Sequence, residues 1–324
     1  MEAARRRVLA ALALGALSVR AVAQRGPSRV AWFAVGDPET ELPYLSALQA
    51  GLRDKGWDEG RNIEIRRFRS LRAPDDFEPV TRQVAEWKPD VVVAQEYAAL
   101  AMLRFAPHVP TVFGFSGDPV DAKLVKSLAH PDSNFSGVSY LASELVGKRI
   151  EFLKEALPGV RRIGILARPQ HPGEPEERKA SEDAAAKLGL EVVYFPIYDP
   201  KEIEKAFAGI RDAKCDALVV FPDFIMYRAR EHISQLAAVA RLPAVSGWSS
   251  FADSGLLFNY GPNLREIYRT LASYVDRILR GARVGQLPVE RPRTVELVVN
   301  LRTARALGVT VTPTVLLRAD RVIE

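Results

Sequence analysis

The feature that most limits the possible folds is a regular alternation of short apolar runs with amphipathic segments. The runs at 29–35 (RVAWFAV) and 90–94 (DVVVA) lack polar alternation, which is typical of parallel strands that are buried on both faces. The segment 44–55 places its leucines on one helical face and ends at Gly56. Strands that alternate with helices in this way predict parallel sheets that are covered by helices on both faces.

This alternation occurs in two successive sets, which favours two doubly wound lobes over one closed barrel. The phrase KPDVVVA at 88–94 returns as KCDALVV at 214–220, so the two halves also share a local sequence. We expect strands at 29–35, 62–68, 90–94, 111–115, 162–167, 191–197, 216–221 and 243–247, and helices at 44–55, 77–87, 98–105, 143–157, 174–188, 201–213 and 227–240.

The last part of the chain has a different order of elements. Strands are expected at 255–260 and 295–299, and helices at 263–280 and 301–307. A chain that returns to its first lobe would create several connections between lobes, and such hinges permit closure around a ligand. The predicted first lobe therefore holds residues 28–138 plus 258–285, and the second holds residues 139–257 plus 286–324.

The N-terminus has the three parts of a secretory signal. Residues 1–7 are short and basic, residues 8–19 are apolar but too few to span a bilayer, and residues 21–23 (AVA) are small. We expect a signal peptide over 1–23 that is cut after Ala23, and a periplasmic mature protein. The three arginines at 5–7 leave both the general secretory and the twin-arginine route open.

Composition argues against several classes of function. The formal net charge is +5, but the signal segment carries a net +3, so about +2 remains. No dense basic stripe with interleaved aromatic residues is present, so we expect no nucleic-acid partner. The single cysteine, Cys215, excludes an internal disulfide, and the four histidines lack metal-ligand spacing, so neither a metal nor a cofactor is expected. The sequence also lacks a G-x-S-x-G elbow, a G-x-G-x-x-G loop and a P-loop, so we do not expect an enzyme.

Six phrases distributed along the chain carry a family resemblance. From about residue 30 to residue 324 the sequence resembles the ABC-transporter substrate-binding proteins of the tryptophan/tyrosine-type group, which have a type I periplasmic-binding-protein fold. The resemblance implies a monomer that captures a small molecule between its lobes and delivers it to an ABC permease and ATPase complex, meeting the membrane only through that transporter. The phrases lie at 51–62 (GLRDKGWDEGRN), 117–120 (GDPV), 147–149 (GKR), 256–262 (LLFNYGP), 287–290 (LPVE) and 300–308 (NLRTARALG).

The ligand site is expected at the carboxyl ends of the strands, where open α/β sheets bind their ligands. The loops that follow the strands supply the candidate residues, and helix N-termini beside them offer free backbone N–H groups. The candidate ligand-binding residues are Gly36, Asp37, Gln95, Glu96, Tyr97, Ser116, Asp118, Arg168, Asp223, Phe224 and Trp248.

Particular roles follow for some of these residues. The resemblance implies that Asp223 pairs with a ligand ammonium, although an Asp at this position can also cap the next helix. Asp118 precedes Pro119, and a turn alone would also explain an Asp at this position. Glu96 stands where amino-acid binders of the family often carry a small hydroxyl residue, so the resemblance does not by itself imply an aromatic amino acid as ligand. Arg168 could offer two donors to a carboxylate, or form a latch with Glu96 across the lobes.

Two further functions remain open at this point. One is a ligand-sensing module that docks to a membrane receptor, and the other is an exported α/β enzyme.

Overall fold

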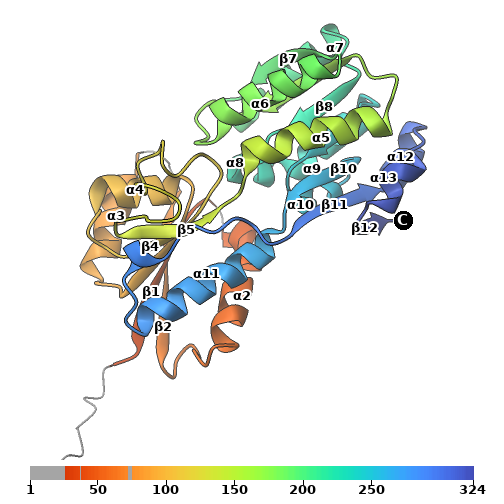
Figure 1. The fold of residues 1–324 in the computed structure, drawn as a ribbon. Coiled ribbons are helices and arrows are strands. Elements are labelled where there is room, and N and C mark those ends of the chain that lie inside the picture. Colours follow the sequence, from red (N-terminus) through yellow and green to blue (C-terminus); the bar gives the residue numbers. More distant parts are fainter. Residues whose placement is uncertain (1–25, 37, 72–74) are drawn as a thin grey trace, which may run out of the picture.

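Two α/β lobes form the protein, each built on its own sheet (Figure 1). The computed structural model describes residues 26–36, 38–71 and 75–324, with the backbone alone along 38–42. The predicted fold class is confirmed, because each sheet is covered by helices on both of its faces. The signal segment predicted at 1–23 and the candidate Asp37 lie outside the described residues.

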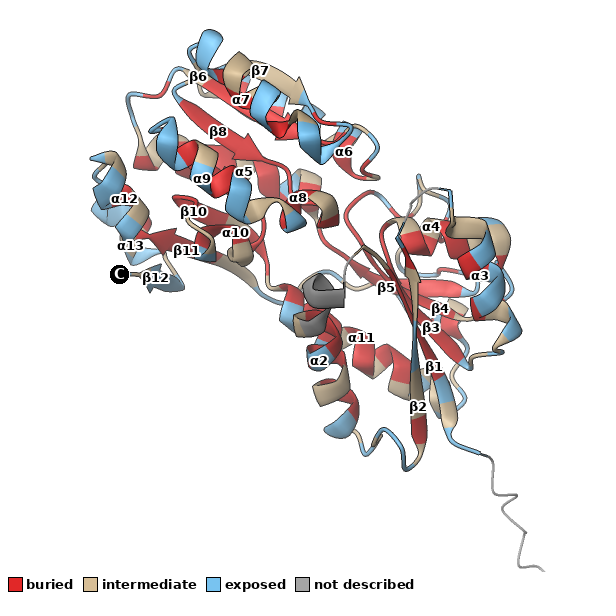
Figure 2. Ribbon diagram, turned by 180° about the vertical axis from the view of Figure 1, so that it is seen from behind, coloured by how far each residue is buried: buried red, intermediate tan, exposed pale blue. Residues whose placement is uncertain are grey.

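The sheet of the first lobe is parallel throughout, with strand order β2-β1-β3-β4-β5. Its carboxyl ends all lie at one edge, and this edge faces the second lobe (Figure 2). The strands are β1 (Ser28–Val35), β2 (Ile63–Ser70), β3 (Val91–Gln95), β4 (Thr111–Phe115) and β5 (Phe135–Ser139).

The second lobe has a larger sheet, with strand order β12-β11-β10-β9-β8-β6-β7. Neighbouring strands are parallel except for β10 and β11, which pair antiparallel. The strands are β6 (Arg162–Ala167), β7 (Glu191–Pro196), β8 (Ala217–Val220), β9 (Ala244–Ser246), β10 (Phe258–Pro262), β11 (Val295–Asn300) and β12 (Arg321–Ile323).

Helices cover both faces of both sheets (Figure 1). In the first lobe, α2 (Pro38–Arg53) and α11 (Leu264–Leu279) pack together on one face, and α3 (Phe77–Glu86) and α4 (Tyr97–Phe105) cover the other. The second lobe contains α5 (Ala142–Ala156), α6 (Glu174–Lys187), α7 (Ile203–Asp212), α8 (Phe224–Arg228), α9 (Arg230–Val239), α10 (Ser249–Asp253), α12 (Leu301–Leu307) and α13 (Pro313–Leu317), with short 3₁₀ turns at Pro200–Glu202 and Val284–Gln286.

Strand β1 shows why the apolar runs must be sandwiched. Val30 and Trp32 belong to the core beneath α2 and α11, while Ala31 and Phe33 belong to the core beneath α3 and α4. Successive side chains of a strand point to opposite faces, so a run that is apolar at every position needs a cover on both. All four residues are fully buried.

The strand β10 differs from its predicted place. We expected residues 258–285 in the first lobe, but β10 pairs with β9 and β11 in the sheet of the second lobe. Only α11, which follows it, packs on α2 in the first lobe. The apolar pattern of 255–260 identified a strand, but a pattern in one segment does not reveal which sheet supplies its hydrogen-bonding partners.

A few elements were also missed or merged. The helix predicted at 227–240 is two helices, α8 and α9, and strands β5 and β12 were not predicted. Strand β5 contains two serines and a glycine, which weakens its apolar signal.

The apolar core is continuous between the lobes. Tyr44 of α2 contacts Phe224 and Tyr227 of α8, at ring-centroid distances of 6.1 and 6.2 Å. Phe224 in turn contacts Trp248, at 5.1 Å. These aromatic residues belong to one core cluster, so the two lobes are packed against each other rather than merely connected.

Candidate ligand-binding site between the lobes

The loops after the strands of the two lobes meet in one small region. The hydroxyl of Ser116, which follows β4, lies 3.1 Å from Nε2 of His171, which follows β6. Both side chains are buried. The carboxyl ends of the two sheets therefore face each other, and the lobes are closed at this point. The parallel strands had led us to expect the site at these ends.

Two glycines make this close approach possible. A Cβ on Gly173 would lie 2.9 Å from Oγ of Ser116 and 3.0 Å from the backbone nitrogen of Gly117, both in the opposite lobe. A Cβ on Gly117 would lie 2.8 Å from the carbonyl oxygen of Pro172. Any larger residue at position 173 would push the lobes apart at this point.

Glu96 occupies the sharp turn between β3 and α4. Its φ of 47° lies in a region that residues other than glycine rarely adopt. Such backbone strain tends to cluster at functional sites, where the surrounding structure maintains it. The turn directs the carboxyl group of Glu96 into the junction, where the residue is only 2% exposed.

The environment of Glu96 favours the neutral carboxylic acid. Its Oε2 accepts hydrogen bonds from the hydroxyl of Ser116 at 3.0 Å and from the Ser116 backbone N–H at 3.3 Å. Burial nevertheless raises the pKa of Glu96 to about 8, because these bonds replace only part of the lost hydration. The other oxygen, Oε1, has no hydrogen-bond partner among the described residues.

His171 is a site residue that sequence reasoning missed. Its Nε2 lies 3.9 Å from Oε2 of Glu96, but burial lowers the pKa of His171 to about 4. Near pH 7 both groups are therefore neutral, and they meet through the hydroxyl of Ser116 rather than as an ion pair. The useful signal was position: His171 lies in the loop after β6, three residues beyond the candidate Arg168.

Arg168 and Asp223 form a buried ion pair within the second lobe. Nη1 of Arg168 lies 3.2 Å from Oδ2 of Asp223, and the side chains are 8% and 3% exposed. The alternative of a latch between Arg168 and Glu96 is wrong, because the ion-pair partner of Arg168 is Asp223, in the loop after the neighbouring strand β8. Asp223 also caps α8, since its Oδ1 accepts the N–H of Met226 at 2.6 Å. The capping role is thus present, and it leaves the ligand role untested.

The region collects buried polar atoms that have no hydrogen-bond partner within the described ranges 26–36, 43–71 and 75–324. Native proteins leave few such atoms, since each costs about 1–3 kcal/mol when it is buried and unpaired. Their concentration in one place therefore indicates a binding site. The atoms are Nε2 and Oε1 of Gln95, Oε1 of Glu96, the hydroxyl oxygen of Tyr97, Nε of Arg168 and Nδ1 of His171.

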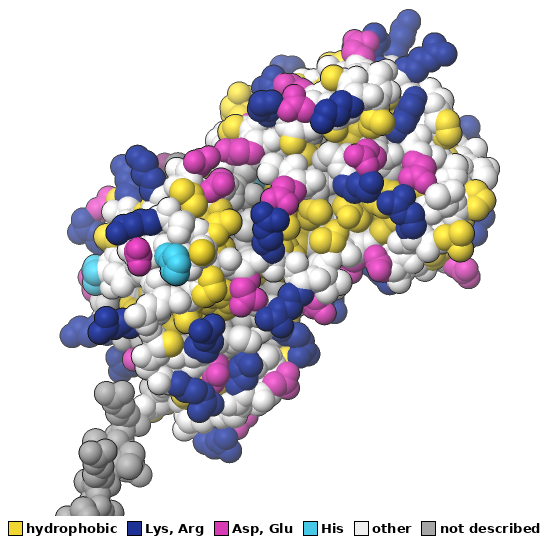
Figure 3. Space-filling model, in the orientation of Figure 1, with side chains coloured by type: hydrophobic (Ala, Val, Ile, Leu, Met, Phe, Trp, Pro, Cys, Tyr) yellow, Lys and Arg dark blue, Asp and Glu magenta, His cyan; other side chains and the backbone are white. Residues whose placement is uncertain are grey.

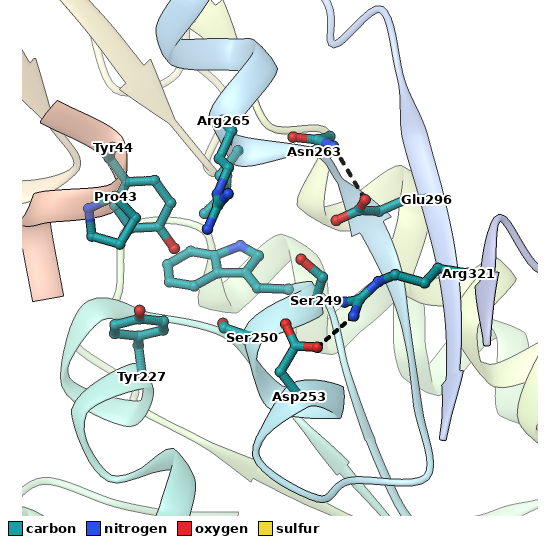
Figure 4. A pocket seen from close by; sticks show the side chains of 12 residues that line it. Pro43, Tyr44, Tyr227, Ser249, Ser250, Asp253, Asn263, Arg265, Glu296 and Arg321 are labelled. Carbon is teal, nitrogen blue, oxygen red and sulfur yellow. Dashed lines mark hydrogen bonds and ion pairs between the residues drawn. The ribbon is translucent and has the colours of Figure 1, made fainter. Parts of the chain in front are cut away.

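Beside this polar cluster lies a cavity of about 330 Å³ with aromatic walls (Figure 4). Pro43 and Tyr44 come from the first lobe, whereas Tyr227 and Trp248 come from the second. The cavity therefore depends on the closed arrangement. Its outer wall is polar and contains the ion pair between Asp253 and Arg321, at 2.7 Å, and the hydrogen bond from Asn263 to Glu296, at 3.1 Å.

The remaining candidates lie further from the polar cluster. Asp118 is exposed, and its carboxylate accepts the backbone N–H groups of Val120 and Asp121, so the structure shows the turn role for it. Gly36 has a φ of 103°, and a Cβ there would lie 3.7 Å from Arg228. Phe224 lies between the polar cluster and the cavity, because it follows Asp223 and contacts Trp248.

Two structural searches of the described residues gave no candidates. Residues 26–36, 38–71 and 75–324 contain no group of three or more His, Cys, Asp or Glu side chains that could hold a metal ion. Within the same ranges, none of the helices combines the length and the apolar character needed to cross a membrane.

This chain belongs to the ABC transporter substrate binding protein family, whose model matches residues 38–323. It is 27% identical over 276 residues to a tyrosine-binding protein of Clostridioides difficile (strain R20291), a match that covers 82% of this chain and 78% of the relative. The expected family and solute-binding function are thereby confirmed.

Solved structures support the same assignment of the fold. A conserved domain protein of Vibrio cholerae is 29% identical, with a TM-score of 0.85 over 91% of this chain and 99% of that protein. An ABC domain from Streptococcus pneumoniae in complex with L-Trp is 23% identical, with a TM-score of 0.83 over 92% of this chain and 100% of that domain.

Proposed function

We propose that this substrate-binding protein captures a small amino-acid-like solute between its lobes and delivers it to an ABC permease and ATPase complex. The observation that carries this proposal is the cluster of unpartnered polar atoms at the junction of the lobes. A solute that completes their hydrogen bonds would remove a cost of about 1–3 kcal/mol for each atom. Closure would then be most stable when the solute is present.

The chemistry of the cluster suits a molecule that carries both an ammonium and a carboxylate. Asp223 and Glu96 offer oxygens to an ammonium group, and Nε of Arg168 and the hydroxyl of Tyr97 offer donors to a carboxylate. The cavity next to Phe224 offers room and aromatic surface for a side chain. The names of two similar proteins, which mention tyrosine and L-Trp, support the amino-acid class.

A serine, a histidine and a carboxyl group lie close together here, but their geometry does not favour hydrolysis. In a catalytic triad the acid accepts a hydrogen bond from Nδ1–H of the histidine and orients the ring. Here Nδ1 of His171 has no partner among the described residues, and Glu96 accepts a hydrogen bond from the hydroxyl of Ser116 instead. We therefore propose that this protein binds its solute without converting it.

The place of action is proposed to be the periplasm. Members of this family are typically extracytoplasmic, and residues 1–23 have the composition of a signal peptide. Intact-mass measurement of protein recovered from the periplasm should show that the mature chain begins at Gln24. Retention of residues 1–23 in the exported protein would contradict the proposed cleavage. On this proposal the protein acts as a monomer.

A thermal-shift screen of residues 24–324 tests solute capture directly. The panel should contain amino acids, amines, carboxylates, purines and sugars, because a solute that binds only the folded state must raise the melting temperature. A concentration one hundred times the dissociation constant would add about 2.7 kcal/mol of stability. An unchanged melting temperature across the panel would contradict the proposed capture. Figure 3 shows acidic and basic side chains interspersed on the face that it presents.

A further inference from the structure

The charges around the proposed site do not balance, and this imbalance has consequences for the ligand. Asp223 is neutralised by Arg168 at 3.2 Å. Glu177, whose carboxyl group also acts on Glu96, is paired with Arg149 at 3.3 Å. Glu96 has no such cationic partner among the described residues, and both Asp223 and Glu177 act on it to raise its pKa.

Among the described residues, the other titratable groups near Glu96 add no positive charge near pH 7. Burial holds His171 neutral, with a pKa of about 4, so it adds no positive charge near pH 7. Burial also raises the pKa values of Tyr97, Tyr140 and Tyr268 above their ordinary range, so these phenols stay neutral. Ser116 satisfies only one of the two oxygens of Glu96.

We propose that the solute carries one more positive than negative charge, and that its extra cation binds Glu96 at the unpartnered Oε1. This inference rests on the proposed solute capture and specifies its substrate class: basic amino acids and related amines. A zwitterion alone would use Asp223 and Arg168 and would leave Glu96 buried without a counter-charge. Glu96 must then either keep its proton or meet a cation, and a buried charge-assisted hydrogen bond is stronger than a neutral one.

The cation displaces the proton of Glu96, so binding is linked to pH. With a pKa of about 8 in the closed, empty protein, roughly nine-tenths of Glu96 is protonated at pH 7. The ionised fraction rises with pH, so affinity for a cation should rise by about 50-fold from pH 6 to pH 8. Calorimetry at pH 7 in two buffers of different ionisation enthalpy should show that roughly one proton is released for each cation bound.

Matched probes separate charge from shape. L-Arginine and L-citrulline have nearly the same shape but differ by one positive charge, as do L-lysine and L-norleucine. We expect that at pH 8 L-arginine, L-lysine or L-ornithine binds at least tenfold more tightly than the neutral probes. The Glu96→Gln variant should lose this preference and the pH slope, whereas Glu64→Gln on the exposed part of β2 should keep both.

Each result decides a particular claim. If none of the three cations binds, or if neutral probes bind as tightly, the proposed charge class is overturned. Solute capture itself still stands in that case, provided that any neutral or acidic solute raises the melting temperature. A pH slope that persists in Glu96→Gln would assign the proton to another group and would also overturn the inference. A circular-dichroism melt of each variant confirms that it is folded.

Discussion

Two buried arginine–carboxylate pairs lie in the second lobe, and they differ in which partner keeps an unbonded atom. Arg149 of α5 donates to Glu177 of α6 at 3.3 Å and, through Nε, to the carbonyl oxygen of Tyr260 at 3.1 Å. Both partners of that pair are at most 1% exposed, and Oε2 of Glu177 has no hydrogen-bond partner among the described residues. In the pair of Arg168 and Asp223, both carboxylate oxygens are bonded, and it is Nε of the arginine that has no partner among the described residues.

The surroundings of the two arginines, Arg149 and Arg168, also differ. The guanidinium of Arg149 lies beneath Gly247, where a Cβ would come within 2.4 Å of its Nη2, so the protein itself fills this region. Arg168 lies at the junction of the lobes, next to the other unpartnered atoms. The same ion-pair chemistry thus leaves a carboxylate oxygen unbonded inside the lobe, and an arginine N–H unbonded where a ligand would bind.

The largest expected effect comes from breaking the enclosed pair. Arg149→Ala would leave Glu177 as an uncompensated buried acid and should lower the free energy of unfolding by about 3–5 kcal/mol. Urea denaturation measures this change. The double variant Arg149→Met with Glu177→Leu should recover most of the stability, because it removes both charges. A loss below about 1 kcal/mol in Arg149→Ala would mean that the two pairs do not differ as described.

The second prediction concerns the pair of Arg168 and Asp223. Asp223→Ala should weaken solute binding by about tenfold or more, because a buried charge-assisted hydrogen bond contributes about 1.5–3 kcal/mol. The same variant should also lower the free energy of unfolding, because it removes the cap on α8 and leaves the buried Arg168 without its counter-charge.

Asp223→Asn is the matched control, because asparagine caps helices about as well as aspartate. We expect it to be more stable than Asp223→Ala, because it keeps the cap, and to lose the affinity, which isothermal titration calorimetry can show. Wild-type affinity in both variants would reduce Asp223 to a capping residue.

The smallest expected effect comes from obstructing closure. Gly173→Ala places a Cβ 2.9 Å from Oγ of Ser116 in the other lobe, so the closed state should become less populated. The apparent affinity should fall by about three- to tenfold, in proportion to that population. Small-angle X-ray scattering with saturating solute should show a larger radius of gyration than for the wild type.

A glycine with free space around it provides the control. Nothing lies within 4 Å of a Cβ on Gly159, so Gly159→Ala should change neither affinity nor shape. If Gly173→Ala closes and binds like the wild type, the contact between the loops does not limit closure.

Much of the architecture could be predicted from local sequence. Continuous apolar runs identified β1, β3 and β8, because only strands covered on both faces need such runs. Parallel strands then placed Gln95, Glu96 and their neighbours at the edge where the ligand is expected. The sheet membership of β10 was not predictable in this way, because its partners are distant in the sequence.

Only part of the site was predicted, because many of its contacts join residues that are distant in the sequence. Arg168 and Asp223 were both candidates, but their pairing depends on the adjacency of β6 and β8. His171 lacked any motif, and its contact with Ser116 exists only when the lobes are closed. Arg149 was visible only as part of a family phrase, since its partner Glu177 lies one helix further along the chain.

By itself, the sequence determined the class of fold, the carboxyl-end loops as the place to look and the family, because periodicity, turn residues and short phrases are local properties. Only the tertiary structure decided which charges neutralise each other. The free energy of a charge depends on its burial and on its neighbours in space, and here these neighbours come from different strands and from both lobes. Glu96 is the clearest example: in the sequence it is one acid among many, and in the fold it is a buried acid without a cationic partner in the part of the chain that the structure describes.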